Sequence, residues 1–211
     1  MFREYLPYYK RNLKVALPVM LTQLGASLVG LFDSIMVGHY ATVDLAAVSF
    51  ANALFFMAMV FAMGALMAIT PLVGVCMGEM NVQQENQSII RNKIAILFQN
   101  GVLFTVLQSA LMLLLLGGCI PFLEYFGQEP EVVAVARPYY ILIVISLVPF
   151  LFFTFFKQFL EGLGNTLVAM IITLAMNGLN ILLNWVFIYG HWGADAMGAT
   201  GAGIGSLISR L

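Results

Sequence analysis

The chain has 211 residues, of which 62% are hydrophobic and only 9% charged, and its formal net charge is −1. Its mean hydropathy of +0.96 excludes an ordinary water-soluble domain, because a soluble fold with so few charges would expose large apolar patches. The near-zero net charge offers no basic field for nucleic acid, so we predict an integral membrane protein whose main partner is the lipid bilayer.

Six apolar runs follow one another along the chain, and they are continuous rather than alternating. This pattern predicts transmembrane helices instead of barrel strands, with roughly 20 residues needed to cross about 30 Å of hydrocarbon. The second run exceeds this length, so we expect it to tilt or to extend beyond the bilayer. The fold class is therefore an all-α membrane bundle of six helices. The predicted spans are residues 15–38, 45–77, 94–117, 132–156, 167–189 and 197–211, the last of them incomplete.

The basic residues predict how the chain is oriented. The first apolar run is too long for a signal peptide, so we expect it to remain as a span. Basic side chains collect in cytoplasmic segments, and only Arg137 falls on the other side. We therefore predict an inner-membrane protein with a cytoplasmic N-terminus. The residues predicted on the cytoplasmic side are Arg3, Lys10, Arg11, Lys14, Arg91, Lys93, Lys157 and Arg210.

Asp33 is the most informative residue of the first span. It lies inside the apolar stretch from Val15 to Tyr40. A carboxylate at membrane depth costs roughly 2.5–3.5 kcal/mol on insertion scales, so such residues usually face a bundle interior or a wet cavity. Asp33 is therefore the first candidate for a proton or ion site.

The fifth span carries a polar face that reaches a similar depth. Polar residues recur in it at helical spacing, namely Thr173, Asn177, Asn180 and Asn184. The sixth span starts from the opposite side of the membrane and carries Ser206. Asp33 and Asn184 each lie about 27 Å from the cytoplasmic face, and Ser206 lies about 13 Å below the outer face. Carboxylate, amide and hydroxyl oxygens suit a hard cation or a proton relay. The alternative is that these amides only bond helices together, most of all at Asn177.

The sequence contains no catalytic signature. We find no HExxH, GxSxG, Walker or CxxC pattern, so we predict neither an enzyme nor a cofactor, and no metal beyond a possible Na⁺ at Asp33, Asn180 and Asn184. Without a nucleotide-binding domain, an ion gradient is the expected energy source. Pro18 and Pro149 lie inside spans and are expected to kink or loosen them.

Several short segments follow one another in a characteristic order along the chain. They are Pro18 with Gln23-Leu24, Asp33 to Gly38, Leu45 to Val48, Gly127 to Val132, Leu160 to Thr166, Asn180 to Asn184, Tyr189-Gly190 and Gly201 to Ser206. In this order and spacing the chain resembles the MATE (multidrug and toxic compound extrusion) family of cation-coupled antiporters. The resemblance implies two six-helix lobes around a central cavity, and residues 1–211 look like the N-terminal lobe.

The same resemblance implies a function and a set of site residues. Members exchange H⁺ or Na⁺ for organic, mostly cationic compounds. Asp33, Asn180 and Asn184 match the cation site of the N-terminal lobe, and Ser206 stands where a threonine is frequent. Some relatives carry a carboxylate at the position of Asn184, so the site here has less charge. Pro18, Gln23 and Asn177 are further candidates, for helix bending or the substrate cavity.

The length of the chain leaves other functions open. The C-terminal lobe of the family is missing, so we expect a truncated product, a fragment or half of a split transporter. Two alternatives to transport by this chain remain. It could be a non-transporting fragment that needs a C-terminal lobe as partner, or a lipid-linked precursor flippase of the wider superfamily. A flippase would need a basic cavity, and the spans hold almost no Lys or Arg.

Overall fold

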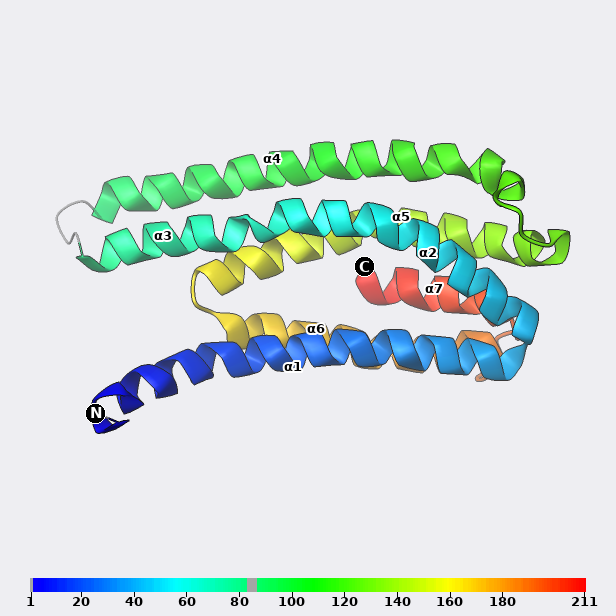
Figure 1. Cartoon of the computed structure of the whole chain (residues 1–211), viewed down its shortest axis with the longest axis horizontal. Coiled ribbons are helices and arrows are strands. Elements are labelled where there is room, and N and C mark those ends of the chain that lie inside the picture. The colour runs from blue at the N-terminus through cyan, green and yellow to red at the C-terminus, as the bar shows by residue number, and fades with distance from the viewer. Residues whose placement is uncertain (1, 83–86) are drawn as a thin grey trace.

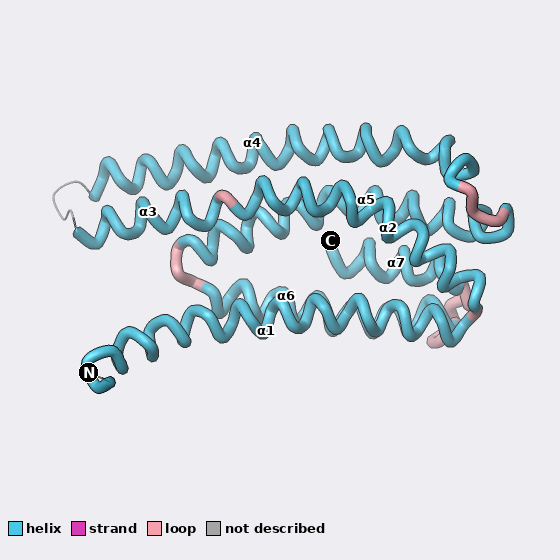
Figure 2. The backbone as a smooth tube through the Cα atoms, viewed as in Figure 1, coloured by secondary structure: helices cyan, strands magenta, loops and turns pink. Residues whose placement is uncertain are grey.

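The computed structural model describes the backbone of residues 2–82 and 87–211 as a helical bundle (Figure 1). The long helices run side by side, and the loops gather at the two ends of the bundle (Figure 2). The helices are α1 (Phe2–Tyr40), α2 (Thr42–Met67), α3 (Ile69–Val82), α4 (Gln87–Cys119), α5 (Pro130–Gly162), α6 (Thr166–Tyr189) and α7 (Gly198–Arg210), with a 3-10 turn at Ile120–Phe126. This architecture confirms the predicted all-α membrane fold.

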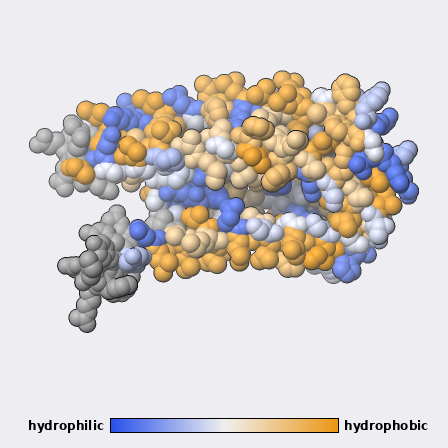
Figure 3. Space-filling view, viewed as in Figure 1, coloured by the Kyte–Doolittle hydropathy of each residue, from blue (hydrophilic) through white to orange (hydrophobic). Residues whose placement is uncertain are grey.

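Five helical stretches are long and apolar enough to cross a bilayer, as judged over the part of the chain that the structure describes. They are Ala16–Tyr40, Thr42–Met80, Gln87–Phe126, Pro130–Gly162 and Thr166–Tyr189. The sixth predicted span corresponds to α7, whose 13 residues extend over only about 20 Å. On the face that Figure 3 shows, hydrophobic residues cover most of the surface, whereas hydrophilic residues gather toward the ends of the bundle and around a recess between its upper and lower helices.

The overlong second run forms two helices instead of one. α2 and α3 meet at Ala68, where Figure 2 shows a short break in the helix. Pro71 explains the break, since its ring nitrogen cannot donate a hydrogen bond to the carbonyl of Met67. Pro138 and Pro149 have no such effect, because α5 continues through both of them.

The helices form two groups that α7 joins. α1 packs along α6, whereas α2, α3 and α4 pack on α5. α7 lies between these groups and contacts α5 and α6 (Figure 1). The side chains of Arg3, Lys10, Arg11 and Lys14, which helped to predict the orientation, lie outside the described residues.

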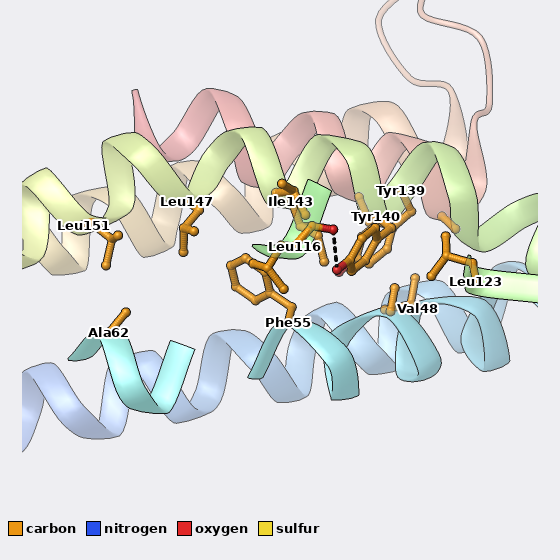
Figure 4. Packing of buried hydrophobic residues seen from close by; sticks show 14 of the residues in the cluster. Val48, Phe55, Ala62, Leu116, Leu123, Tyr139, Tyr140, Ile143, Leu147 and Leu151 are labelled. Atoms are coloured by element: carbon orange, nitrogen blue, oxygen red, sulfur yellow. Dashed lines mark hydrogen bonds between the residues drawn. The ribbon is translucent and has the colours of Figure 1, made fainter. Parts of the chain in front are cut away.

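The apolar core lies between α2 and α5. Side chains of these helices point toward one another, with Val48, Phe55 and Ala62 facing Ile143, Leu147 and Leu151 (Figure 4). The Tyr140 hydroxyl is buried in this core and donates to the carbonyl of Leu116 at 3.2 Å. This core fixes α5 as the support against which α7 is placed.

Candidate functional site

Asp33 faces the neighbouring helix α6 rather than the lipid. Its Oδ1 accepts a hydrogen bond from Nδ2 of Asn184 at 2.6 Å. Asn184 is fully buried, whereas Asp33 is half-buried at the contact between α1 and α6. A charge-assisted bond of this length is among the stronger contacts available inside a membrane protein. One turn further along α1, the Tyr189 hydroxyl donates to the carbonyl of Met36 at 2.8 Å and holds the same pair of helices together.

The hydrogen bonds continue from α6 into α7. Asn184 Nδ2 also donates to Oδ1 of Asn180 at 3.3 Å, since the two amides lie one turn apart on α6. Asn180 Nδ2 in turn lies 3.4 Å from Oγ of Ser206 and 3.3 Å from Oγ of Ser209. The structure thus brings Asp33, Asn180, Asn184 and Ser206 into one chain of hydrogen bonds that crosses three helices. We call these four residues and Ser209 the polar relay.

Ser209 was not among the residues selected from the sequence. It lies three positions after Ser206, so both hydroxyls fall on the face of α7 that meets α6. The signal was therefore present in the spacing. Ser209 also donates its own proton to the carbonyl of Ser206 at 3.1 Å, which leaves its oxygen to accept from Asn180.

Glycines of α7 allow the close approach on which the polar relay depends. A Cβ atom at Gly201 would overlap the backbone of Phe187, and one at Gly205 would overlap Oδ1 of Asn184. Small residues at this spacing are the usual means by which membrane helices come into close contact. The α6–α7 turn is equally restricted, because Gly190 has φ 75° and a Cβ atom there would lie 2.7 Å from the nitrogen of Ala196.

The side-chain oxygen of Asn184 is buried and accepts no hydrogen bond. A buried carbonyl without a donor is costly, so it calls for an explanation, and a proton or ion that is received there is one. Together with the Asp33 carboxylate, this oxygen gives the polar relay an acceptor capacity that the lobe itself does not use. Among the described residues, no three His, Cys, Asp or Glu side chains group as metal ligands.

The other three candidate residues lie away from the polar relay. Pro18 is buried in α1, where its carbonyl accepts from the Thr22 hydroxyl at 2.8 Å. Gln23 is exposed on α1. Asn177 lies between α6 and α1, where a Cβ atom at Gly25 would come 3.0 Å from its Nδ2. That Nδ2 is buried and makes no hydrogen bond.

The structure corrects the prediction that Arg210 lies on the cytoplasmic side with Lys157. Arg210 is the thirteenth residue of α7 and lies about 20 Å from the start of that helix, and Figure 1 marks the adjoining chain end about halfway along the bundle. Its Nη1 donates to Oγ of Ser146 at 2.8 Å, at the middle of α5. Its guanidinium carbon lies 5.0 Å from the ring centre of Phe150 and 5.8 Å from that of Phe55.

Comparisons with known proteins identify the family. A model of the MatE family matches residues 18–186. The probable multidrug resistance protein NorM of Bacillus licheniformis is 30% identical over 201 residues, which cover 95% of this chain and 42% of that protein. The multidrug resistance protein NorM of Vibrio parahaemolyticus is 34% identical over 200 residues, which cover 93% and 41%. The chain therefore spans less than half the length of these relatives.

Solved structures show the same fold. A MATE protein in the straight conformation matches with a TM-score of 0.76 at 21% identity, over 95% of this chain and 42% of its own. An outward-facing multidrug resistance MATE family transporter of the MOP superfamily matches with a TM-score of 0.73 at 22% identity and the same coverage. The family model covers most of the sequence and the bundle agrees with one lobe of these structures, so this multi-pass membrane chain belongs to the MatE family.

Proposed function

We propose that this chain supplies the N-terminal lobe of a secondary multidrug transporter. In this proposal the transporter exchanges H⁺ or Na⁺ for organic, mostly cationic compounds and lies in the cytoplasmic membrane with the N-terminus of the chain inside. The bond between Asp33 and Asn184 carries the proposal, because it places a membrane-embedded carboxylate beside an unused buried oxygen. The names of the NorM relatives support the substrate class.

The coupling step follows from hydrogen-bond chemistry. An ionised Asp33 only accepts, and it orients the amide nitrogen of Asn184 toward itself. Once neutralised by a proton, the carboxyl becomes a donor and needs an acceptor instead. Asn184 provides one when its amide rotates, and this rotation turns its nitrogen away from Asn180. A Na⁺ ion would demand the same change, because it too is bound by oxygen.

This exchange of partners links the ion to the arrangement of the helices. The bonds that change connect α1 to α6 and α6 to α7. An ion at Asp33 therefore favours one packing of the three helices, and an organic cation that uses the same carboxylate favours the other. Differential binding of this kind is what thermodynamic coupling between two ligands requires.

The test is efflux of ethidium from cells that express the chain together with a second MatE lobe. Asp33→Asn should lower efflux to the level of cells with an empty vector while the protein still reaches the membrane. Asp195→Asn is the matched control, since Asp195 is exposed in the loop between α6 and α7. Efflux by the Asp33→Asn variant at the wild-type rate would refute the role of Asp33.

The same assay separates the two alternatives. Efflux that needs the added lobe supports an incomplete chain with a C-terminal partner, whereas efflux by the chain alone shows that no partner is required. A lipid-linked precursor flippase needs several basic side chains in its interior. In the described part of the bundle, Arg210 is one such group, and its guanidinium is bound to Ser146. If loss of Asp33 stopped lipid precursor export and left ethidium efflux intact, the flippase would replace the drug transporter.

A further inference from the structure

Arg210 places a permanent positive charge in the interior of the lobe. It makes a single side-chain hydrogen bond, to Ser146, and no carboxylate of the described residues lies within ion-pair distance of it. Two aromatic rings, Phe150 and Phe55, cover the guanidinium. An arginine keeps its proton even at membrane depth, so its positive charge persists inside the lobe.

Ser146 holds this charge in place. Its hydroxyl is fully buried and donates to the carbonyl of Ile143 at 2.8 Å, so its oxygen is left to accept from Arg210. The cation–π contacts with the two phenylalanines add to this anchor. The position of the guanidinium is therefore fixed by α5 and α2, independently of the polar relay.

The polar relay connects the carboxylate of Asp33 to the part of α7 that carries Arg210. The polar relay leads from Asp33 through Asn184 and Asn180 to Ser209, and Arg210 is the next residue of α7. Of the other groups around them, Tyr139 of α5 donates its hydroxyl to Asn52 at 2.9 Å and carries no charge. Among the described residues, the polar relay therefore holds one carboxylate, and Arg210 carries a positive charge next to it in α7.

We propose that Arg210 is a specificity-determining residue that makes the lobe select compounds with one positive charge over compounds with two. This inference rests on the proposed function. The first positive charge of a bound compound neutralises Asp33. A second positive charge on the same compound finds no further carboxylate in the polar relay, and the guanidinium of Arg210 repels it. Selection by a repulsive group is as effective as selection by a new contact, since specificity is a difference between two binding free energies.

Two dyes with the same ring system test the proposal. Ethidium has one positive charge and propidium has a second one on a longer side chain, so the change in the ratio of their affinities when Arg210 is replaced reports the effect of the second charge. Binding is measured by fluorescence on the purified 211-residue chain in detergent. We expect the wild-type chain to favour ethidium, and Arg210→Gln to reduce this preference by about tenfold, the scale on which one unit charge acts at an effective dielectric constant near 20.

Matched variants exclude a merely structural role. Arg210→Lys keeps the charge and should keep the preference for ethidium. Arg137→Gln removes the same charge from the exposed pair with Glu124 and should change nothing. An unchanged ratio in Arg210→Gln, with ethidium still bound through Asp33, would overturn the inference and leave the proposed function standing. Loss of the preference in Arg210→Lys would also overturn it. If Asp33→Asn bound ethidium as well as the wild type in every background, the proposed function would fail and this inference with it.

Discussion

The contact between α4 and α5 and the contact between α6 and α7 both pass through a glycine, but different groups face the two glycines. Gly101 of α4 faces the ring of Phe155. The centre of that ring lies 5.6 Å from the ring centre of Phe98 and 6.1 Å from that of Phe159. Gly205 of α7 faces the amide of Asn184. The first contact is filled by aromatic rings and the second by polar groups.

The difference separates two tasks within one lobe. At the aromatic contact, apolar rings fill the space that the glycine leaves, and their close packing supports the shape of the bundle. The polar contact places three helices around one carboxylate. In the proposed transporter the lobe needs both contacts, because a charged site that moves has to be carried by a framework that does not rearrange. The predictions below test this division, beginning with the largest effect.

Removing the buried ring should damage the framework and spare the site. Phe155 is fully buried, so Phe155→Ala is expected to lower the free energy of unfolding by about 3–5 kcal/mol. Thermal unfolding in detergent measures this loss, and ethidium binding per folded chain should stay unchanged. Phe61→Ala is the control, because the Phe61 ring is 76% exposed and should face lipid. Equal losses in the two variants would contradict the assignment of Phe155 to the framework.

Adding one methyl group at the polar contact should impair ethidium binding, which the Phe155→Ala variant is expected to keep. In Gly205→Ala the new Cβ atom overlaps Oδ1 of Asn184, so either α7 moves away or the amide turns from Asp33. We expect a loss of about 1–3 kcal/mol in stability together with a loss of ethidium binding. Gly178→Ala provides the control on α6, since its Cβ atom would meet nothing within 4 Å. Ethidium binding that survives in Gly205→Ala would show that the polar relay does not need this contact.

The smallest expected effect is at the start of α7. Asp44 of α2 accepts a hydrogen bond from the backbone nitrogen of Ala199 at 2.6 Å and so caps the helix. Asp44→Ala should cost about 0.5–2 kcal/mol in the free energy of unfolding, whereas Asp44→Asn, which keeps an acceptor, should cost less. Thermal unfolding of both variants checks this order. A larger loss in Asp44→Asn than in Asp44→Ala would mean that the charge and not the cap matters at this position.

Helical periodicity and the cost of polar groups in lipid were enough to predict the spans and the polar face of α6. Depth along each span then grouped Asp33 with Asn180, Asn184 and Ser206 before any contact between them was known. Depth can be predicted from sequence because the position of a residue along a membrane-spanning helix fixes its distance from the membrane surface. For a residue within a span, its distance from the membrane surface is the main quantity that the sequence reveals.

The failures have the same origin. The break at Ala68 depends on Pro71. The length of this apolar run predicts a tilted or extended span, and it does not predict where the helix breaks. Arg210 was assigned to the membrane surface because basic residues usually lie there, whereas its depth in a short α7 places it beside Ser146. Which neighbour a side chain meets at a given depth depends on how the helices turn about their axes, and a single sequence does not contain that information.

The central claim is that an organic cation and a coupling ion compete for Asp33. The direct measurement is the number of cations displaced when ethidium binds to the purified chain, with H⁺ followed in weak buffer and Na⁺ with a selective electrode. The account predicts about one cation displaced per ethidium bound in the wild type and none in Asp33→Asn. Ethidium binding without displacement, or equal displacement in both proteins, would contradict it.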